Sequence, residues 1–267
     1  MANTARGLVP VAWLAASLGA LSCTGSTGGD LFEFEARAAG AAGTTAGQPY
    51  VFTNDRGYTV TLTKATLHVG ALYLNQSVPT SVASDTSCIL PGIYVAEVTE
   101  GLDIDALDPT PRPFPGLGYA TANDARTAEI WLTGGDIDAE SDPTVIAAVE
   151  GTAVGPAGAF PFVGSITIGQ NRLEPPTNPA QPGSKPICKQ RVVTPIAVDL
   201  SPEPGGSLLL RVDPAGWFGN VEFSELERIV DDPPLYAFRD DGEDQPSQNL
   251  YAGVRANAGV YRITWED

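Results

Sequence analysis

The chain has 267 residues, with 32 Asp and Glu against 15 Lys and Arg, which gives a formal net charge of −17. Such an acidic chain without a basic run would be repelled by the phosphates of DNA or RNA, so we expect no nucleic-acid partner. It contains one His, three Cys and one Met, which leaves little material for a multi-histidine metal centre or a thioether copper site.

Residues 1–22 are typical of a secretory signal peptide. Arg6 precedes an apolar run from Gly7 to Leu21, and about 15 apolar residues are too few to span a bilayer. Ser22 and Cys23 follow, and this junction resembles the lipobox of bacterial lipoproteins, in which a peptidase cuts before a Cys that becomes lipid-modified. The resemblance implies lipidation at Cys23. An ordinary signal peptide cut nearby, leaving Cys23 as a spare thiol, is the alternative.

Residues 23–30 are rich in Gly, Ser and Thr and predict a flexible tether, so the lipid would hold a folded domain close to a membrane. Thr24 rather than Asp follows the Cys. By resemblance to lipoprotein sorting, this favours export to the outer membrane, facing the periplasm or the cell surface. Residues 31–267 contain no obvious linker and predict a single domain.

Alternating apolar and polar residues predict strands from the start of this domain. Phe32, Phe34 and Ala36 share one face. Tyr58–Leu62 and Ala65–Tyr73 are also apolar at every second position but out of phase, which predicts a bulge near Thr63–Lys64. Further strands are predicted at Ile93–Val98, Thr127–Thr133, Val145–Val154, Phe160–Ile168, Val192–Leu200, Ser207–Val212, Val221–Phe223 and Leu250–Trp265.

Turn signals separate these strands. Gly155–Gly158 predicts a hairpin, and Ser201–Gly206 and Asn257–Gly259 predict connections between strands. Ser224–Val230 is the one segment that predicts a helix, with Ser224 as its N-cap. The sequence therefore predicts an all-β fold, an antiparallel β-sandwich with long Pro/Gly-rich loops and at most one short helix.

Two proline-rich segments, Asp103–Asn123 and Leu173–Lys189, predict irregular surface loops. Cys188 ends the second, and Cys88 precedes a predicted strand. In an oxidising compartment these two predict a disulfide that closes a loop of roughly 100 residues, worth about 4–5 kcal/mol. A reactive or metal-bound thiol pair is the alternative, although the sequence has no CxxC motif.

The most concentrated acidic segment contains Asp136, Asp138, Glu140 and Asp142. Carboxylates at alternate positions can direct several oxygens to a calcium ion. The segment departs from an EF-hand loop because Ser141 stands where Gly is needed. A solvated acidic turn is the alternative.

His68 is the single imidazole, placed in a predicted strand on the face opposite Leu67 and Val69. We weigh two roles for it, a half-exposed strand residue and a metal ligand or catalytic base. No GxSxG elbow accompanies it. We therefore expect no enzymatic activity, with a carbohydrate-active enzyme kept as an alternative.

Trp131 and Trp217 are candidate ligand-binding residues, because exposed aromatic rings beside acids stack on sugars in many β-sandwiches. Packing in the core is the alternative for each of them, and also for Trp265.

The segments FEFEA, PYVFTNDRGYTVTLTKATLHVGALYL and VDPAGWF together resemble bacterial envelope lipoproteins of unassigned function. They are more distantly similar to the MbnP-like copper-binding periplasmic domain. That resemblance implies a copper site built from His68 with Trp217 or Trp131.

The sequence thus predicts a lipid-anchored envelope β-sandwich that acts as a binding or structural module and needs no cofactor. Its partner would be an envelope protein or a carbohydrate. A periplasmic protein that binds copper or calcium is the main alternative.

Overall fold

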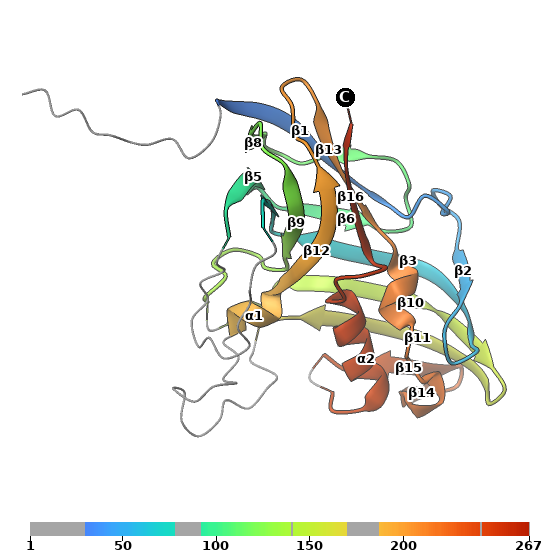
Figure 1. Cartoon of the computed structure of the whole chain (residues 1–267). Coiled ribbons are helices and arrows are strands. Elements are labelled where there is room, and N and C mark those ends of the chain that lie inside the picture. Colours follow the sequence, from blue (N-terminus) through green and yellow to red (C-terminus); the bar gives the residue numbers. More distant parts are fainter. Residues whose placement is uncertain (1–29, 78–91, 140, 170–186, 241, 267) are drawn as a thin grey trace, which may run out of the picture.

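The computed structural model describes residues 30–77, 92–139, 141–169, 187–240 and 242–266. Strands dominate these residues and form two sheets that share one apolar core (Figure 1). The predicted all-β sandwich is confirmed. The signal peptide, Cys23, nearly all of the tether and Cys88 lie outside the described residues, so the predictions about them stay predictions.

The larger sheet has nine strands, eight of them in one continuous order, and β7 (Arg112–Pro113) pairs with β1 beside that path. Its order is β12 (Val192–Leu200), β9 (Ala125–Trp131), β4 (Ala71–Asn75), β5 (Tyr94–Val98), β8 (Gly118–Thr121), β1 (Leu31–Gly40), β13 (Ser207–Val212) and β16 (Tyr261–Glu266). The end strands β12 and β16 approach each other, so this sheet curls toward closure.

The second sheet has seven strands, and β6 (Leu102–Asp105) pairs with β3 beside its main path. Its order is β14 (Glu227–Asp231), β15 (Pro234–Phe238), β11 (Gly158–Thr167), β10 (Val145–Gly155), β3 (Thr59–Val69) and β2 (Tyr50–Thr53). The pairs β1–β13 and β11–β15 are parallel and the other strand pairs of the described residues are antiparallel, so the sandwich is mostly antiparallel.

Two local predictions in the second sheet are confirmed. Lys64 lies opposite Glu150 and Leu62 opposite Gly151, which leaves Thr63 as the extra residue of the expected bulge. The Gly155–Gly158 turn joins β10 to β11 as a hairpin, and Gly158 has a φ of 129°, which a residue with a Cβ rarely adopts.

The predicted continuous strand Ala65–Tyr73 is wrong after Val69, because the chain crosses from one sheet to the other at Gly70. A Cβ on Gly70 would come within 2.2 Å of the Thr133 carbonyl oxygen, so the crossing needs glycine. After it, Leu72 and Leu74 point into the core and Tyr73 points outward. The expectation that Tyr73 belongs to the apolar face is therefore also wrong.

The predicted helix Ser224–Val230 is wrong. Its start forms the 3-10 turn η2 (Phe223–Glu225), and its β-branched end pairs with β15 as strand β14. A helix instead forms at α2 (Gln245–Val254), where a strand was expected from Leu250 onward. The Asp244 side chain caps it by accepting a hydrogen bond from the Ser247 amide, 2.8 Å away.

Four more local predictions need correction. The first proline-rich segment is not irregular, since it contains most of β6 and all of β7 and β8. Asn257–Gly259 connects α2 to β16 rather than two strands, and no strand forms at Val221–Phe223. In the second proline-rich segment, the described residues begin a single helical turn, α1 (Ile187–Arg191).

The core is richest in aromatic rings where β11 and β15 pack against the 3-10 turns η1 (Pro214–Phe218) and η2. Phe162, Phe218, Phe223 and Phe238 lie with ring centroids 5.2 to 6.0 Å apart. Trp217, in η1, is completely buried there. Burying one such side chain stabilises the fold by about 1.5–3 kcal/mol, so this cluster holds η1 against the sheets.

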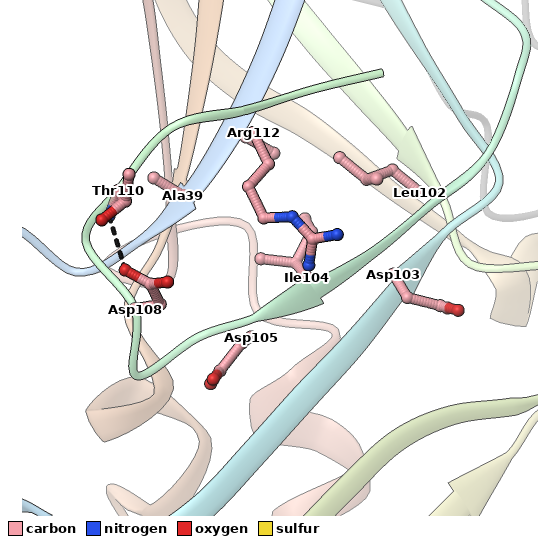
Figure 2. Close-up of a pocket in the computed structure, with 9 residues that line it drawn as sticks. Ala39, Leu102, Asp103, Ile104, Asp105, Asp108, Thr110 and Arg112 are labelled. Carbon is pink, nitrogen blue, oxygen red and sulfur yellow. Dashed lines mark hydrogen bonds between the residues drawn. The ribbon is translucent and has the colours of Figure 1, made fainter. Parts of the chain in front are cut away.

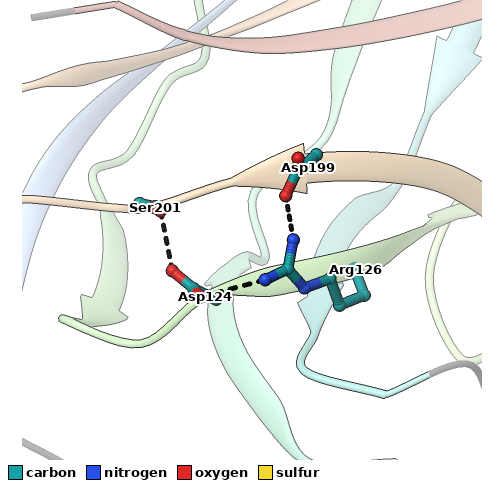
Figure 3. A network of polar contacts seen from close by, with 4 residues as sticks. All are labelled: Asp124, Arg126, Asp199 and Ser201. Atoms are coloured by element: carbon teal, nitrogen blue, oxygen red, sulfur yellow. Dashed lines mark hydrogen bonds and ion pairs between the residues drawn. The ribbon is translucent and has the colours of Figure 1, made fainter.

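A polar network at the edge of the large sheet joins β12 to β9, whose pairing has two register shifts (Figure 3). Arg126 bridges Asp124, at 3.1 Å, and Asp199, while the Ser201 hydroxyl donates to Asp124 at 2.7 Å. All four groups are exposed, so the network contributes about 0–1 kcal/mol. It fixes the position of the edge strand rather than forming a site.

Among the described residues, no helix is long and apolar enough to cross a membrane.

Candidate functional site

The outer face of the large sheet carries an alternating row of carboxylates and phenols. Glu129 on β9 lies opposite Tyr73 on β4, Tyr73 opposite Glu97 on β5, Glu97 opposite Tyr119 on β8, and Tyr119 opposite Glu33 on β1. Directly opposed residues point to the same face of a sheet. The five side chains therefore form one line across five strands, which we call the Glu–Tyr row.

The core determines that this row faces outward. On each of the five strands, the residues just before and just after the row residue are buried or half-buried, because their side chains point into the core. Because side chains alternate along a strand, the row residues must take the opposite face. The inward neighbours are Ala128, Ile130, Leu72, Leu74, Ala96, Val98, Gly118, Ala120 and Phe34.

Exposure increases along the row from β9 to β1. Glu129 is completely buried and Tyr73 is half-buried, whereas Tyr119 is 43% exposed and both Glu97 and Glu33 are exposed. The row thus has a buried end at Glu129 and an open end that solvent and ligands can reach.

At the buried end, neutral groups surround the Glu129 carboxylate. The Asn75 amide donates to it at 3.0 Å and the Tyr94 hydroxyl lies 3.4 Å from its other oxygen. No Lys or Arg of the described residues pairs with it. Burial raises the pKa of Glu129, and the nearby Trp131, Tyr94 and Asn75 side chains only partly oppose this effect.

The same end holds an aromatic cluster. The rings of Tyr73 and Tyr94 have centroids 5.3 Å apart, and those of Tyr73 and Trp131 are 4.8 Å apart. Burial, with the charges of nearby glutamates, raises the pKa of both tyrosines, so their hydroxyls stay protonated. Trp131 Nε1 makes no regular hydrogen bond to a described residue, although it is near enough to Glu129 to affect its pKa.

At the open end, Glu97 and Glu33 make no hydrogen bond or ion pair with any described residue. Arg37, which follows on β1, is already bonded to Glu35 at 2.7 Å. Neighbouring strands lie about 4.8 Å apart, so the backbones of these two glutamates stand about 10 Å apart with Tyr119 between them. This end can accept hydrogen bonds, attract a cation and offer an aromatic ring to one ligand.

Two of the four candidate calcium ligands, Asp136 and Asp142, accept local hydrogen bonds. Asp136 accepts from the Asp138 amide at 3.0 Å. Asp142 accepts from the amides of Gly134 and Thr144 at 2.8 and 3.0 Å. Glu140 lies outside the described residues, and no group of three potential metal ligands occurs among the described ones.

The backbone of this acidic loop is held by a buried cation. Arg191 is completely buried and donates to the carbonyl oxygens of Ile168 and Ile137, both at 2.9 Å, and of Asp136 at 3.3 Å. The guanidinium thus binds the carbonyl oxygens that a metal ion in this loop would need as ligands.

His68 lies on β3 directly opposite Asp103 on β6, and its Nδ1 is 2.7 Å from the Asp103 carboxylate. Its side chain is 20% exposed and Asp103 is 86% exposed, so the pair lies at the surface. Neither Trp131 nor Trp217 forms a hydrogen bond with the ring.

A shallow hollow lies beside this pair, between β1 and β6 (Figure 2). In Figure 2 the Arg112 side chain extends toward Ile104, with Leu102 to one side, while Asp103 and Asp105 point away from the guanidinium. Hydrogen bonds from Thr110 lower the pKa of Asp108, with a smaller contribution from Arg112. Asp105 and Asp108 accept hydrogen bonds from the backbone of the following turn, and Asp103 pairs with His68, so the hollow lacks converging ligand groups.

The two candidate tryptophans have different positions. Trp217 is completely buried in the core, whereas Trp131 is half-buried at the aromatic end of the row. Trp265 is half-buried against Phe34, with centroids 5.0 Å apart. Of the three, Trp131 alone belongs to the row's surroundings.

Cys188 on α1 is 1% exposed and is disulfide-bonded. Cys88 lies outside the described residues, so its assignment as the partner stays a prediction.

Sequence reasoning missed Tyr73, Tyr94, Asn75, Tyr119 and the three glutamates of the row. The available signal was a Glu or Tyr at a single outward position inside otherwise apolar strands, as in AEIW and GYAT. That signal does not say which strands are neighbours. Comparison with protein-family models, curated proteins and solved structures gave no match to the chain.

Proposed function

We propose that this protein is a lipid-anchored binding module of the cell envelope that takes an extended ligand on the Glu–Tyr row. The observation that carries the proposal is the open end of the row. There Glu97 and Glu33 have no partner among the described residues and flank the exposed ring of Tyr119.

The arrangement is unusual for a purely structural surface. Opposite charges across a strand pair stabilise a sheet, and a lysine or arginine beside each glutamate would be the simple structural solution. The row places tyrosines at those positions instead. Carboxylates and aromatic rings in alternation supply the polar contacts and contact area that ligand recognition requires.

The predicted anchor supports the same role. Glu33 lies ten residues after Cys23 in the sequence. Ten residues span at most about 35 Å, so a lipid at Cys23 would keep the row close to the membrane surface. A tethered module of this kind would bind ligands within the envelope.

A thermal-shift panel with the full chain in detergent tests this function. The probes are peptidoglycan fragments, neutral gluco-oligosaccharides and linear amines. We expect at least one class to raise the Tm of the wild-type chain and to have little effect on a Glu97→Gln, Tyr119→Leu double variant.

Equal shifts for the double variant, or no shift with any probe, would rule out the row as a binding face. Intact mass of the native N-terminus tests the anchor separately, and an unmodified Cys23 would contradict it.

A further inference from the structure

We propose that the ligand is a linear polyamine that lies across β5, β8 and β1, with its terminal ammonium groups on Glu97 and Glu33 and its chain over the ring of Tyr119. This inference rests on the proposed function and specifies the ligand class of the same face.

Charge is the first reason. The open end holds two exposed carboxylates without a cationic partner among the described residues, and Glu129 adds a third at the buried end of the row. The chain as a whole has 32 acidic against 15 basic side chains. A cationic ligand is attracted by this field, and an anionic one is repelled.

Spacing is the second reason. The backbones of Glu97 and Glu33 are two strands apart, about 10 Å, and extended spermidine is long enough to span this distance over Tyr119. Putrescine is shorter, so it can meet both carboxylates only by lying between them. The geometry therefore favours the longer chain.

Tyr119 is the third reason. It lies directly between the two carboxylates in the register and is 43% exposed. A tyrosine ring attracts ammonium groups through its π-electrons, and methylene groups pack on its face. A polyamine alternates ammonium and methylene groups, so its ammonium groups can meet the two carboxylates while its methylene groups pack on the tyrosine ring.

The buried end gives the row its rigidity. Tyr73 stands on the other side of Glu97 and packs against Tyr94 and Trp131 at 5.3 and 4.8 Å. Asn75 and Tyr94 in turn hold Glu129. This fixed wall limits the positions that Glu97 can take, which lowers the entropic cost of binding.

The test is isothermal titration of the full chain in detergent with spermidine at low salt. We expect saturable binding that weakens with added NaCl, and about fivefold weaker binding for Glu97→Gln or Glu33→Gln. The double variant should lose about 25-fold, and Tyr119→Leu about fivefold.

Two comparisons separate this geometry from general attraction to an acidic protein. Glu225→Gln, an exposed carboxylate on η2, should leave spermidine binding unchanged. Putrescine, with one ammonium group fewer, should bind more weakly than spermidine, and its affinity should also fall in the Glu97→Gln and Glu33→Gln variants.

Equal weakening by Glu225→Gln, or no effect of the Glu97/Glu33 double variant, would overturn the polyamine site. If spermidine does not bind but a neutral oligosaccharide or trilysine binds in a Tyr119-dependent way, the ligand class is wrong and the binding face stands. If no probe depends on the row, both proposals fail. Circular dichroism of each variant confirms that loss of binding is not loss of folding.

Discussion

In the acidic loop at Asp136–Asp142, Asp136 and Asp142 accept hydrogen bonds from nearby backbone amides, and Asp142 also accepts one from the Thr133 hydroxyl. A buried arginine donates to the carbonyl oxygens of Asp136 and Ile137 in this loop. In the Glu–Tyr row, Glu97 and Glu33 come from strands far apart in the sequence and have no partner among the described residues. The comparison teaches that Asp136 and Asp142 satisfy local structure, whereas Glu97 and Glu33, which strand register aligns, remain available for a ligand.

The largest effect is expected at Arg191, which anchors the acidic loop. Arg191→Met would leave three carbonyl oxygens without their buried donor and should destabilise the protein by about 3 kcal/mol or more. Urea unfolding measures the change. Arg262→Met, an exposed arginine on β16, is the matched control and should change stability by less than about 0.5 kcal/mol. Similar losses for both variants would contradict the structural role of Arg191.

Asp142→Ala should cost about 1–2 kcal/mol, because Asp142 accepts from Gly134 and Thr144 amides. Asp138→Ala, in the same loop but with an exposed side chain, should cost far less. A larger loss for Asp138 would indicate that the loop carboxylates serve another purpose, such as binding an ion.

The stability contributed by Asp142 should depend on pH. Partial burial would raise its pKa, but hydrogen bonds from Thr144, Gly134 and Thr133 outweigh burial and lower the pKa from 3.8 to about 2. A carboxylate whose pKa is lower in the folded state stabilises the protein at pH values above its unfolded-state pKa. This stabilisation is lost as the pH falls through its folded-state pKa. The difference between the wild type and Asp142→Ala should therefore shrink from pH 3.8 toward pH 2.

Glu129→Gln should stabilise the protein by about 1 kcal/mol at neutral pH, since it removes a buried ionisable group while keeping its shape. Burial raises the pKa of Glu129, so the ionised form is the destabilising one. The gain should disappear as the pH falls below the raised folded-state pKa toward the ordinary value of 4.5, because the wild-type carboxyl is then protonated too. Thermal unfolding over this range measures it. A destabilised variant would show that the hydrogen bonds to the carboxylate outweigh the cost of burying its charge.

The smallest effect on stability is expected at the open end of the row. Glu97→Gln removes an exposed carboxylate without a described partner, so the unfolding free energy should change by less than about 0.5 kcal/mol. Chemical denaturation of this variant beside Asp142→Ala tests the comparison directly. A loss as large as that of Asp142→Ala would place Glu97 among the structural acids.

Local patterns predicted several elements of the fold correctly. The phase shift at Thr63–Lys64 and the Gly155–Gly158 turn depend on neighbouring residues, and both are confirmed. The helix expected at Ser224–Val230 is wrong because pairing with β15 outweighs the weak local preference for a helix. Tyr73 is misplaced because the crossing at Gly70 exchanges one sheet for the other, which periodicity does not reveal.

The sequence by itself determined the all-β class, the acidity of the chain and the residue types available for chemistry, because these depend on composition and on side-chain alternation along single strands. The tertiary structure alone decided which acids stand together. Strand order places Glu129, Tyr73, Glu97, Tyr119 and Glu33 in one line, although they come from five separate strands. The physical reason is register: cross-strand hydrogen bonds align residues that are distant in sequence, and each strand carries only one member of the row.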